Sequence, residues 1–292
     1  MKMFIKRLIP KKLIFWVAVV VIVISFFQSN NVVDNYETEP IDNLVVRFVD
    51  VGQADCEILQ FPDGRNIIID GGKNDTEDNL VKKIKKYGIE KFDYVIATHP
   101  HEDHIGGLDK VIDNFEIGCV YMPDATSNSK TFSDMLDSIE NKNVEVKQAK
   151  AGITVIDEEK INMVFVAPNS DYYEETNDYS AVVKLTYNGC SFLFTGDAEA
   201  LSEREMLANG MDLRAQILKV GHHGSSTSTT YEFLRKVNPT YAVIEVGKDN
   251  SYGHPHDETM EALDGIKVYR TDTDGTITME CDGVNLAVTT EK

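Results

Sequence analysis

The seven histidines of this 292-residue chain all lie in three short segments, each shortly after a stretch of β-rich sequence. Histidines that were only solvated or packed in a core would be scattered along the chain. Their grouping instead indicates that the fold brings the ends of several strands together at one site. The three segments are 99–104, 222–223 and 254–256.

The first segment, HPHEDH, has a spacing that is typical of metal binding. His99 and His101, two residues apart, can hold one metal ion from a bent loop, and the pair Asp103 and His104 indicates a second ion nearby. Imidazole and carboxylate groups are ligands of zinc and similar divalent ions in open catalytic sites. A solvated polar loop is the weaker interpretation.

Asp197 ends the apolar run FLFTGD. An aspartate at the end of a strand often caps the helix that follows, and that explanation remains open for Asp197 taken alone. Together with the histidines, however, Asp197 is interpreted as the carboxylate that bridges two metal ions. We interpret Glu199 as an acidic residue of the first helical turn, where negative charge is favourable.

The other two histidine groups are less specific. In the segment VGHHGS one histidine can bind a metal while its neighbour points elsewhere. In YGHPH, Pro255 fixes a turn, and His254 is the stronger candidate for a role in the site than His256.

The charge balance limits the partners of the chain. It has 29 Lys and Arg against 48 Asp and Glu, and five of the basic residues lie in residues 1–30, which contain no acid. The remainder therefore has 24 basic and 48 acidic residues, a formal charge of −24. Such a surface argues against a protein that coats DNA or RNA. A small phosphate ester or the end of a nucleic-acid strand remains compatible with this charge, because bound metal ions offset the charge locally.

Residues 1–30 are predicted to be a signal anchor or a signal peptide. Fifteen apolar or nearly apolar residues (13–27) follow the basic cluster, and no small-residue cleavage site is evident. We favour an uncleaved anchor over a cleaved signal. The positive-inside rule then places the rest of the chain outside the cell. Residues 31–43 are expected to be a linker, and residues 44–292 to be the catalytic domain.

The four cysteines contain no C-x-x-C pair, which gives no support to a cysteine-based zinc site or thioredoxin-like chemistry. We expect buried free thiols, with pairing in an exported chain as the alternative.

Residues 44–292 alternate strands and helices in two halves, which predicts an α/β fold with two sheets faced by helices. The loops over 123–160 and 168–178 are expected to shape the pocket. Strands are predicted over 44–50, 56–61, 66–70, 93–98, 118–122, 160–167, 180–187, 191–196, 217–221, 241–247 and 276–281, and helices over 77–87, 106–115, 131–141, 198–209, 229–236 and 257–264.

Taken together, these motifs resemble the metallo-β-lactamase superfamily, and more closely the hydrolase domain of competence DNA-uptake (ComEC-like) proteins. The resemblance runs in family order from residue 44 to about 290 and implies a four-layer αββα sandwich. It rests on FVDVGQADCEIL, IIIDGG, THPHEDHIGGL, NDYSAVVKLTYNGCSFLFTGDA, LKVGHHGSSTS and VGKDNSYGHPH.

The resemblance also implies roles for the site residues. Two divalent ions, zinc or alternatively manganese, would activate a hydroxide that attacks the substrate. Metal ligands would be His99 and His101 for one ion, Asp103, His104 and His222 for the other, and Asp197 for both; Asp103, His223 and His254 would contact the hydroxide or the substrate.

Two departures from the family pattern matter. The wider superfamily has a further histidine ligand between the first motif and the bridging aspartate, but residues 105–196 contain no histidine. Asn177 and Ser180 bracket the matching segment, so the first metal is expected to be more open. The chain keeps His101 where many competence-type domains have Asp, which favours an active enzyme.

Three functions follow. The favoured one is a stand-alone exported phosphodiesterase or nuclease-like hydrolase, acting on a small phosphoester or a nucleic-acid end, attached to the membrane by its N-terminal segment and without an inferred protein partner. The alternatives are a cell-surface phosphorylcholine-type esterase and a non-catalytic binding module with a degenerate metal site. β-Lactam hydrolysis is not expected, because the missing ligand is one that branch requires.

Overall fold

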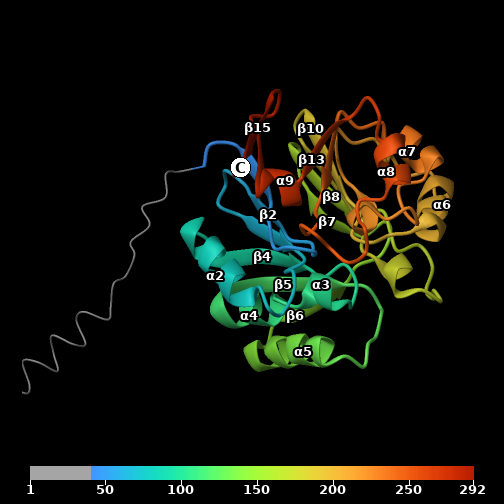
Figure 1. Ribbon diagram of the computed structural model, residues 1–292. Coiled ribbons are helices and arrows are strands. Elements are labelled where there is room, and N and C mark those ends of the chain that lie inside the picture. The colour runs from blue at the N-terminus through green and yellow to red at the C-terminus, as the bar shows by residue number, and fades with distance from the viewer. Residues whose placement is uncertain (1–40) are drawn as a thin grey trace, which may run out of the picture. The chain divides into compact units, whose positions relative to one another are not determined.

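The computed structural model describes residues 41–292 (Figure 1). The predicted membrane segment and nearly all of the predicted linker lie outside the described residues. Within residues 41–292, no helix combines the length and the apolar character needed to cross a membrane.

The first half of the chain, with the C-terminal hairpin, builds an eight-stranded mixed sheet. Strands β3, β4, β5 and β6 run parallel to one another, whereas the remaining neighbours are antiparallel. In spatial order the sheet consists of β15 (Leu286–Thr290), β14 (Ile277–Cys281), β1 (Leu44–Phe48), β2 (Glu57–Gln60), β3 (Asn66–Ile69), β4 (Lys91–Ile96), β5 (Glu116–Met122) and β6 (Glu145–Gln148).

The second half builds a seven-stranded sheet. Its strands β10 to β13 are parallel, and β7 to β10 form an antiparallel meander. The spatial order is β13 (Lys267–Arg270), β12 (Tyr241–Ile244), β11 (Ile217–Lys219), β10 (Cys190–Phe194), β9 (Val183–Tyr187), β8 (Ile161–Phe165) and β7 (Thr154–Asp157).

Helices cover the outer face of each sheet, so that the domain has four layers (Figure 1). Helices α2 (Glu77–Lys86), α4 (Leu108–Asn114) and α5 (Lys130–Lys142) cover the eight-stranded sheet, and α6 (Ala200–Ala208), α7 (Tyr231–Val237) and α8 (Asp257–Ala262) cover the other. Short helical segments complete the list: α3 (Glu102–Ile105), α9 (Thr271–Asp274), η1 (Thr176–Tyr179) and η2 (Gly221–Gly224).

Alternation along the strands explains the layers. In β10, Phe192 and Phe194 point into the core between the two sheets, whereas Leu193 packs under the outer helices. Ile68 and its neighbours in β3 divide between two cores in the same way. Side chains on both faces are buried, and each fully buried side chain of this size contributes about 1.5–3 kcal/mol. The αββα prediction is confirmed.

The strands that the sequence did not predict are short or polar. β6 has the sequence EVKQ and is fully exposed at one edge of its sheet, so it has no apolar pattern to read. β7, β13 and β15 are also edge strands. The segment 123–160, whose loops were expected to shape the pocket, contains the predicted helix α5 and also the strands β6 and β7, which were not predicted.

The expectation of four free thiols is wrong for two of them. Cys190, at the start of β10, and Cys281, at the end of β14, form a disulfide between the two sheets. The 91 residues that separate them gave no local sign of this contact. Cys56 and Cys119 are buried free thiols, as expected.

Candidate metal centre

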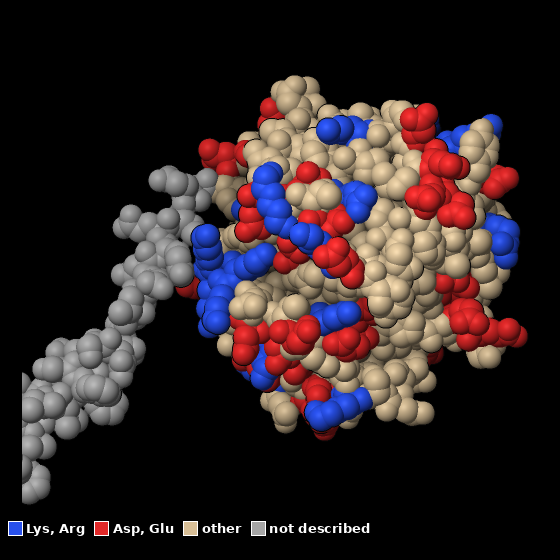
Figure 2. Space-filling view, in the orientation of Figure 1, with Lys and Arg blue, Asp and Glu red and all other residues tan. Residues whose placement is uncertain are grey.

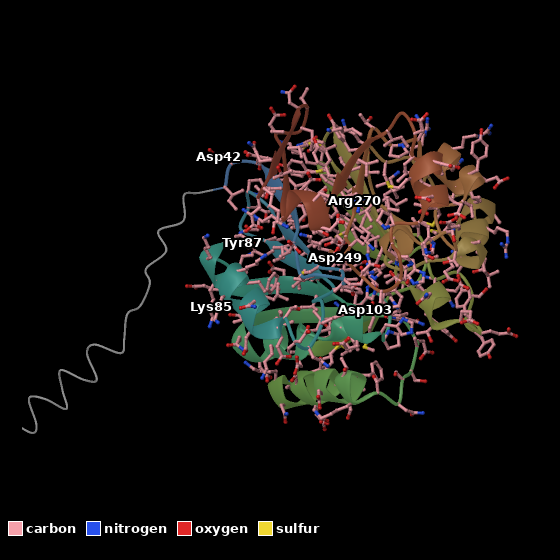
Figure 3. The ribbon with its side chains drawn as sticks, viewed as in Figure 1. Asp42, Lys85, Tyr87, Asp103, Asp249 and Arg270 are labelled. Atoms are coloured by element: carbon pink, nitrogen blue, oxygen red, sulfur yellow. A yellow bond between two sulfur atoms is a disulfide. The ribbon has the colours of Figure 1, made fainter. Side chains whose placement is uncertain are left out.

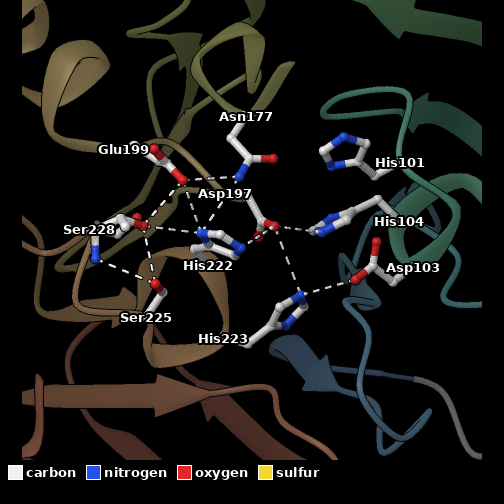
Figure 4. Close-up of polar contacts among 12 residues, drawn as sticks. His101, Asp103, His104, Asn177, Asp197, Glu199, His222, His223, Ser225 and Ser228 are labelled. Carbon is white, nitrogen blue, oxygen red and sulfur yellow. Dashed lines mark hydrogen bonds and ion pairs between the residues drawn. The ribbon is translucent and has the colours of Figure 1, made fainter. Parts of the chain in front are cut away.

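The predicted site residues follow strands that end at the same edge of the sandwich. His99 comes three residues after β4, Asp197 three residues after β10, and the segment η2 shortly after β11. Because β4 runs parallel to β3, and β10 to β11, the loops after these strands lie at one edge of each sheet. The metal centre therefore lies between loops of both sheets (Figure 4).

The centre of the arrangement is one oxygen of Asp197. Four histidines point their Nε2 atoms at the Oδ2 atom of Asp197, a residue that is almost completely buried. The distances are 3.2 Å for His104, 3.7 Å for His222 and 3.8 Å for His223 (Figure 4). The distance for His99 is 3.9 Å. No other carboxylate among residues 41–292 has so many imidazoles around it, which supports the bridging position expected for Asp197.

On one side of Asp197, a compact group is formed by Asp103, His104 and His223. His223 Nε2 lies 3.5 Å from Asp103 Oδ2, and one ligand atom of each residue lies within 4.8 Å of the others. His222 belongs to no such group among residues 41–292. The distances therefore favour His223 over His222 as the residue that joins Asp103 and His104.

The backbone of η2 explains why two adjacent histidines diverge. His222 and His223 both have left-handed conformations, with φ of 48° and 52°. Such a conformation costs a non-glycine residue about 1–3 kcal/mol and persists only where the surroundings require it. As a result, both Nε2 atoms reach Asp197 although the ring centroids are 6.1 Å apart.

Buried polar groups hold the Nδ1 atoms of His104 and His223, the ring nitrogens that face away from Asp197. Nδ1 of His104 lies 2.7 Å from Asp70 Oδ2, and Nδ1 of His223 lies 2.9 Å from the carbonyl oxygen of Glu245. A histidine that donates its Nδ1 proton in this way presents a free Nε2 to a metal. Asp70 also accepts a hydrogen bond from Thr98 Oγ1, at 2.6 Å, which fixes its carboxylate.

A buried ion pair lies behind His223. Asp55 Oδ1 is 3.2 Å from His223 Nδ1, and Asp55 Oδ2 accepts a hydrogen bond from Lys219. Burial alone would lower the pKa of Lys219, but the surrounding carboxylates, with Asp55 the strongest of them, together outweigh burial and raise the pKa. Sequence reasoning assigned no role to Asp55, Asp70 or Lys219, although the motifs DVGQ-x-D, IIIDGG and LKVGHHGS contain them. Membership in these motifs was the sequence signal from which a role for the three residues could have been inferred.

On the other side of Asp197 the arrangement is looser. Nε2 of His99 and Nδ1 of His101 face each other at 3.0 Å, which suits two ligands of one ion. His222 is partly exposed, with 24% of its side chain accessible. This is the side on which the family's further histidine is absent.

Two residues near His222 take part in this looser side. Glu199 was interpreted as a helix-end charge; it does precede α6, but its Oε1 atom lies 3.2 Å from His222 Nδ1. Asn177 donates a hydrogen bond to the same carboxylate at 3.0 Å, and its own Oδ1 is buried without a partner. Glu199 is therefore a positioning residue for His222, which a helical pattern alone does not reveal.

Electrostatics differ between the two sides. Burial lowers the pKa of His99 well below its usual value and also lowers that of His101. For His223 burial acts in the same direction, but Asp197 and Asp55 outweigh it and raise the pKa to about 10. The pKa of His104 is likewise raised, against burial, by Asp197 and Asp70. Neighbouring carboxylates therefore raise the histidine pKa values on the His223 side, whereas burial lowers those of His99 and His101.

The residues present fit a divalent cation. His104 Nε2, His223 Nε2 and Asp197 Oδ1 are buried and make no hydrogen bond. Buried polar atoms almost always have a partner, and imidazole nitrogens with carboxylate oxygens are the donor set of divalent metals such as zinc. Asp103, His104, His223 and Asp197 would hold one ion. His99, His101 and Asp197, with His222 beside them, form the candidate set for another.

A cavity of about 380 Å³ opens over the metal centre. His254 lies on its wall, with its ring centroid 5.6 Å from that of His222. Burial, together with His222 and His223, lowers the pKa of His254 to about 4, so its ring is neutral at pH 7. His256 lies outside the cavity and accepts a hydrogen bond from the Ser226 backbone, which suits a structural role. The cavity is lined by Gln53, Lys73, His101, Glu102, Asp103, Asn177, Asp197, His222, His223, Tyr252 and His254.

Only one of the two segments that were expected to shape the pocket contributes to this lining. Asn177, from the loop 168–178, lies on the cavity wall, whereas no lining residue comes from 123–160. The expectation is therefore wrong for the longer segment, in which α5 and β6 pack on the eight-stranded sheet and β7 forms an edge of the seven-stranded sheet.

Comparison with known proteins agrees with the site. The sequence profile described as the Metallo-beta-lactamase superfamily, a fold that typically binds divalent metals, matches residues 49–247. ComE operon protein 3 of Bacillus subtilis is 29% identical over 251 residues, which cover 80% of this chain and 32% of that protein. Competence protein ComA of Neisseria gonorrhoeae is 26% identical over 247 residues, 82% of this chain and 33% of its own length. The chain thus spans about a third of these relatives.

Solved structures show the same fold at low sequence identity. CmlA, a diiron beta-hydroxylase from Streptomyces venezuelae, has a TM-score of 0.56 and 13% identity, covering 82% of this chain and 54% of CmlA. The metallo-beta-lactamase fold protein YhfI from Bacillus subtilis has a TM-score of 0.54 and 11% identity, covering 82% of this chain and all of YhfI. These similarities concern the fold alone.

Proposed function

This chain belongs to the metallo-beta-lactamase superfamily, and we propose that it is a metal-dependent hydrolase of phosphodiester bonds. The similarity to two competence proteins supports a substrate related to nucleic acid. The acidic body argues against a long binding track for such a substrate. On the face shown in Figure 2, basic and acidic side chains are interspersed, and no continuous basic band crosses it.

The observation that carries the proposal is the convergence of four imidazole Nε2 atoms on Asp197 Oδ2 beneath an open cavity. We propose two ions, with zinc as the preferred metal and manganese as the alternative, because nitrogen and oxygen ligands suit both. Two such ions, when bound, lower the pKa of a shared water and polarise the P–O bond.

The side chains of this protein then have distinct tasks. Asp197 and Asp103 present carboxylate oxygens to the cavity and orient the attacking group. His223 is assigned to metal binding because its Nε2 lies among Asp103, His104 and Asp197. That leaves His254, neutral at pH 7, to hydrogen-bond the substrate phosphate or to accept a proton.

Hydrolysis of two chromogenic substrates tests the function. Purified protein loaded with zinc or manganese should release p-nitrophenol from bis-p-nitrophenyl phosphate much faster than from p-nitrophenylphosphorylcholine, and a chelator should abolish the reaction. Metal analysis should find about two ions per chain. Faster cleavage of the choline ester would favour the phosphorylcholine esterase. Metal binding without any hydrolysis would favour the non-catalytic module.

We also propose that residues 1–30 anchor the protein in the cell membrane with the catalytic domain outside. The disulfide between Cys190 and Cys281 supports an oxidising compartment, since such bonds rarely persist in the cytosol. Protease added to intact cells should degrade the domain, and washing with carbonate should leave the full-length chain in the membrane. Release of a shortened chain into the medium would indicate cleavage instead.

A further inference from the structure

Two residues on the cavity wall have no place in the metal centre. Tyr252 and Lys73 both line the cavity of about 380 Å³, and neither offers a ligand to the metal positions described above. Tyr252 belongs to the loop between β12 and α8, and Lys73 follows β3, so they come from different sheets. Figure 3 labels Asp249 of the Tyr252 loop and Asp103 of the metal centre.

The ring of Tyr252 is available to a ligand. Tyr252 is 61% exposed, although one side of its ring stacks on His254 with centroids 5.6 Å apart and planes 24° apart. His254 in turn lies nearly parallel to His223, at a centroid distance of 6.3 Å. The aromatic surface therefore extends from the metal centre to the mouth of the cavity.

The loop holds this ring in place. Asn250 Oδ1 accepts hydrogen bonds from the backbone of Tyr252 at 3.2 Å and of His254 at 3.0 Å. Asn250 Nδ2 donates to the carbonyl oxygens of Gly247 at 3.0 Å and of His254 at 2.7 Å. A platform that is already ordered loses little conformational entropy when a ligand binds.

Lys73 contributes the complementary charge. Its ammonium makes no ion pair or hydrogen bond with any residue in 41–292, although the protein is strongly acidic. It is also the one Lys or Arg among the residues that line the cavity. An unpaired cation in the same cavity as an exposed aromatic ring suits an anionic ligand with a planar group.

We propose that Tyr252 and Lys73 form a subsite for one nucleotide of a single-stranded nucleic acid. The unpaired base stacks on Tyr252, and a neighbouring phosphate lies against Lys73. A cavity of about 380 Å³ has room for a nucleotide but not for a duplex, and bases stack on aromatic side chains only when they leave the helix. This inference rests on the proposed phosphodiester hydrolysis, and it specifies that the substrate is single-stranded.

The first test measures binding with metals chelated, so that no turnover is needed. A fluorescein-labelled oligothymidylate and an abasic strand of the same length are titrated with wild-type protein, Tyr252→Ala and Tyr252→Phe. We expect Tyr252→Ala to weaken binding of the oligothymidylate about tenfold and to leave the abasic strand unchanged. Tyr252→Phe, which keeps the ring, should bind like the wild type.

Lys73 has a different expected signature. Lys73→Gln should weaken binding of both strands by the same factor, and it should reduce the slope of log affinity against log salt by about 0.7, the value for one phosphate contact on a single strand. Matched controls are Tyr231→Ala, a similarly exposed tyrosine outside the cavity, and Lys142→Gln at the end of α5. Neither control should change binding.

The outcomes separate the subsite from the function. The subsite is overturned if Tyr252→Ala binds the oligothymidylate and the abasic strand as tightly as the wild type does. It is also overturned if neither strand binds the wild-type protein. A Tyr252 requirement confined to p-nitrophenylphosphorylcholine also overturns it and points to a bound ammonium. Base-dependent binding through Tyr252 without hydrolysis in the presence of metal contradicts only the proposed function, whereas hydrolysis that is independent of Tyr252 contradicts only the subsite.

Discussion

The two sides of the metal centre share Asp197 but are built differently. On one side, His104 and His223 are almost fully buried, and buried groups hold their Nδ1 atoms. On the other side, His101 and His222 are partly exposed, and the group that holds His222 is the partly exposed Glu199. We call these the His223 side and the His222 side.

The side chains at the two proposed metal positions therefore differ in their degree of preorganisation. Asp55 and Asp70 are fully buried and cannot easily move away from the imidazoles they contact. Glu199 is shared among His222, Asn177 and Thr227, and it faces solvent in part. We therefore expect tighter metal binding on the His223 side and easier exchange on the His222 side, next to the substrate cavity.

The largest effect is expected from Asp197→Ala, because this change removes the one group common to both sides. Turnover should fall about 10³-fold or more, and the metal content should fall at both positions. Metal analysis and hydrolysis of bis-p-nitrophenyl phosphate measure this. Asp264→Ala, at an exposed position, is the control and should behave like wild type. Full metal content in Asp197→Ala would contradict the bridging role.

The next effect distinguishes the two sides directly. Asp70→Asn should weaken the tighter metal position about 10–100-fold, because the amide holds His104 less firmly than the carboxylate does. Glu199→Gln should change only the weaker position, and by a smaller factor. Competition with a chromophoric chelator measures both affinities. Equal losses in the two variants would show that the sides are not independently organised.

Proton release on metal binding gives a third test. A metal needs neutral imidazole, and the pKa of His223 is about 10 while that of His104 is raised well above its usual value. Binding on the His223 side at pH 7 should therefore release about two protons, whereas His99 and His101, whose pKa values are lowered, should release none. Calorimetry in buffers of different ionisation enthalpy counts these protons.

The same pKa shift predicts how the stability of the metal-free protein depends on pH. His223 is protonated in the folded protein, where its pKa lies above the value of about 6.5 that it has in the unfolded chain. The contribution of His223 to the free energy of unfolding is complete below about pH 6.5 and is lost as the pH rises toward 10. Urea unfolding of the metal-free protein at pH 6 and pH 9 should show lower stability at pH 9. The opposite order would contradict a protonated His223.

The smallest effect on activity is expected from the disulfide. Cys190 lies at the opposite end of β10 from Asp197, about 20 Å along the strand. Replacing Cys190 and Cys281 by serine should lower the free energy of unfolding by about 2–4 kcal/mol and leave kcat within about twofold of the wild type. Thermal and urea unfolding measure the first quantity. A large loss of kcat would show that the tie between the sheets controls the metal centre.

The sequence predicted the residues of the metal centre where these residues lie close together in a single motif. In HPHEDH four candidate ligands lie within six positions after an apolar strand, so spacing alone predicts a metal site. Asp55, Asp70 and Lys219 were not assigned, because a single acidic or basic residue after a strand has many possible partners. Their roles depend on contacts between residues as far apart as Asp55 and Lys219, 164 positions along the chain.

The sequence by itself determined the α/β class with two sheets faced by helices, through apolar runs and helical periodicity, and it determined which loops carry metal-binding residue types. The four-layer arrangement was implied by the resemblance to the metallo-β-lactamase superfamily. The tertiary structure decided which of the adjacent residues His222 and His223 faces Asp103, because that choice depends on two left-handed backbone conformations that no spacing rule encodes. It also decided the pairing of Cys190 with Cys281 and the place of Tyr252 on the cavity wall. Local patterns report the preferences of single segments, whereas contacts between segments exist only after two sheets have packed around a common core.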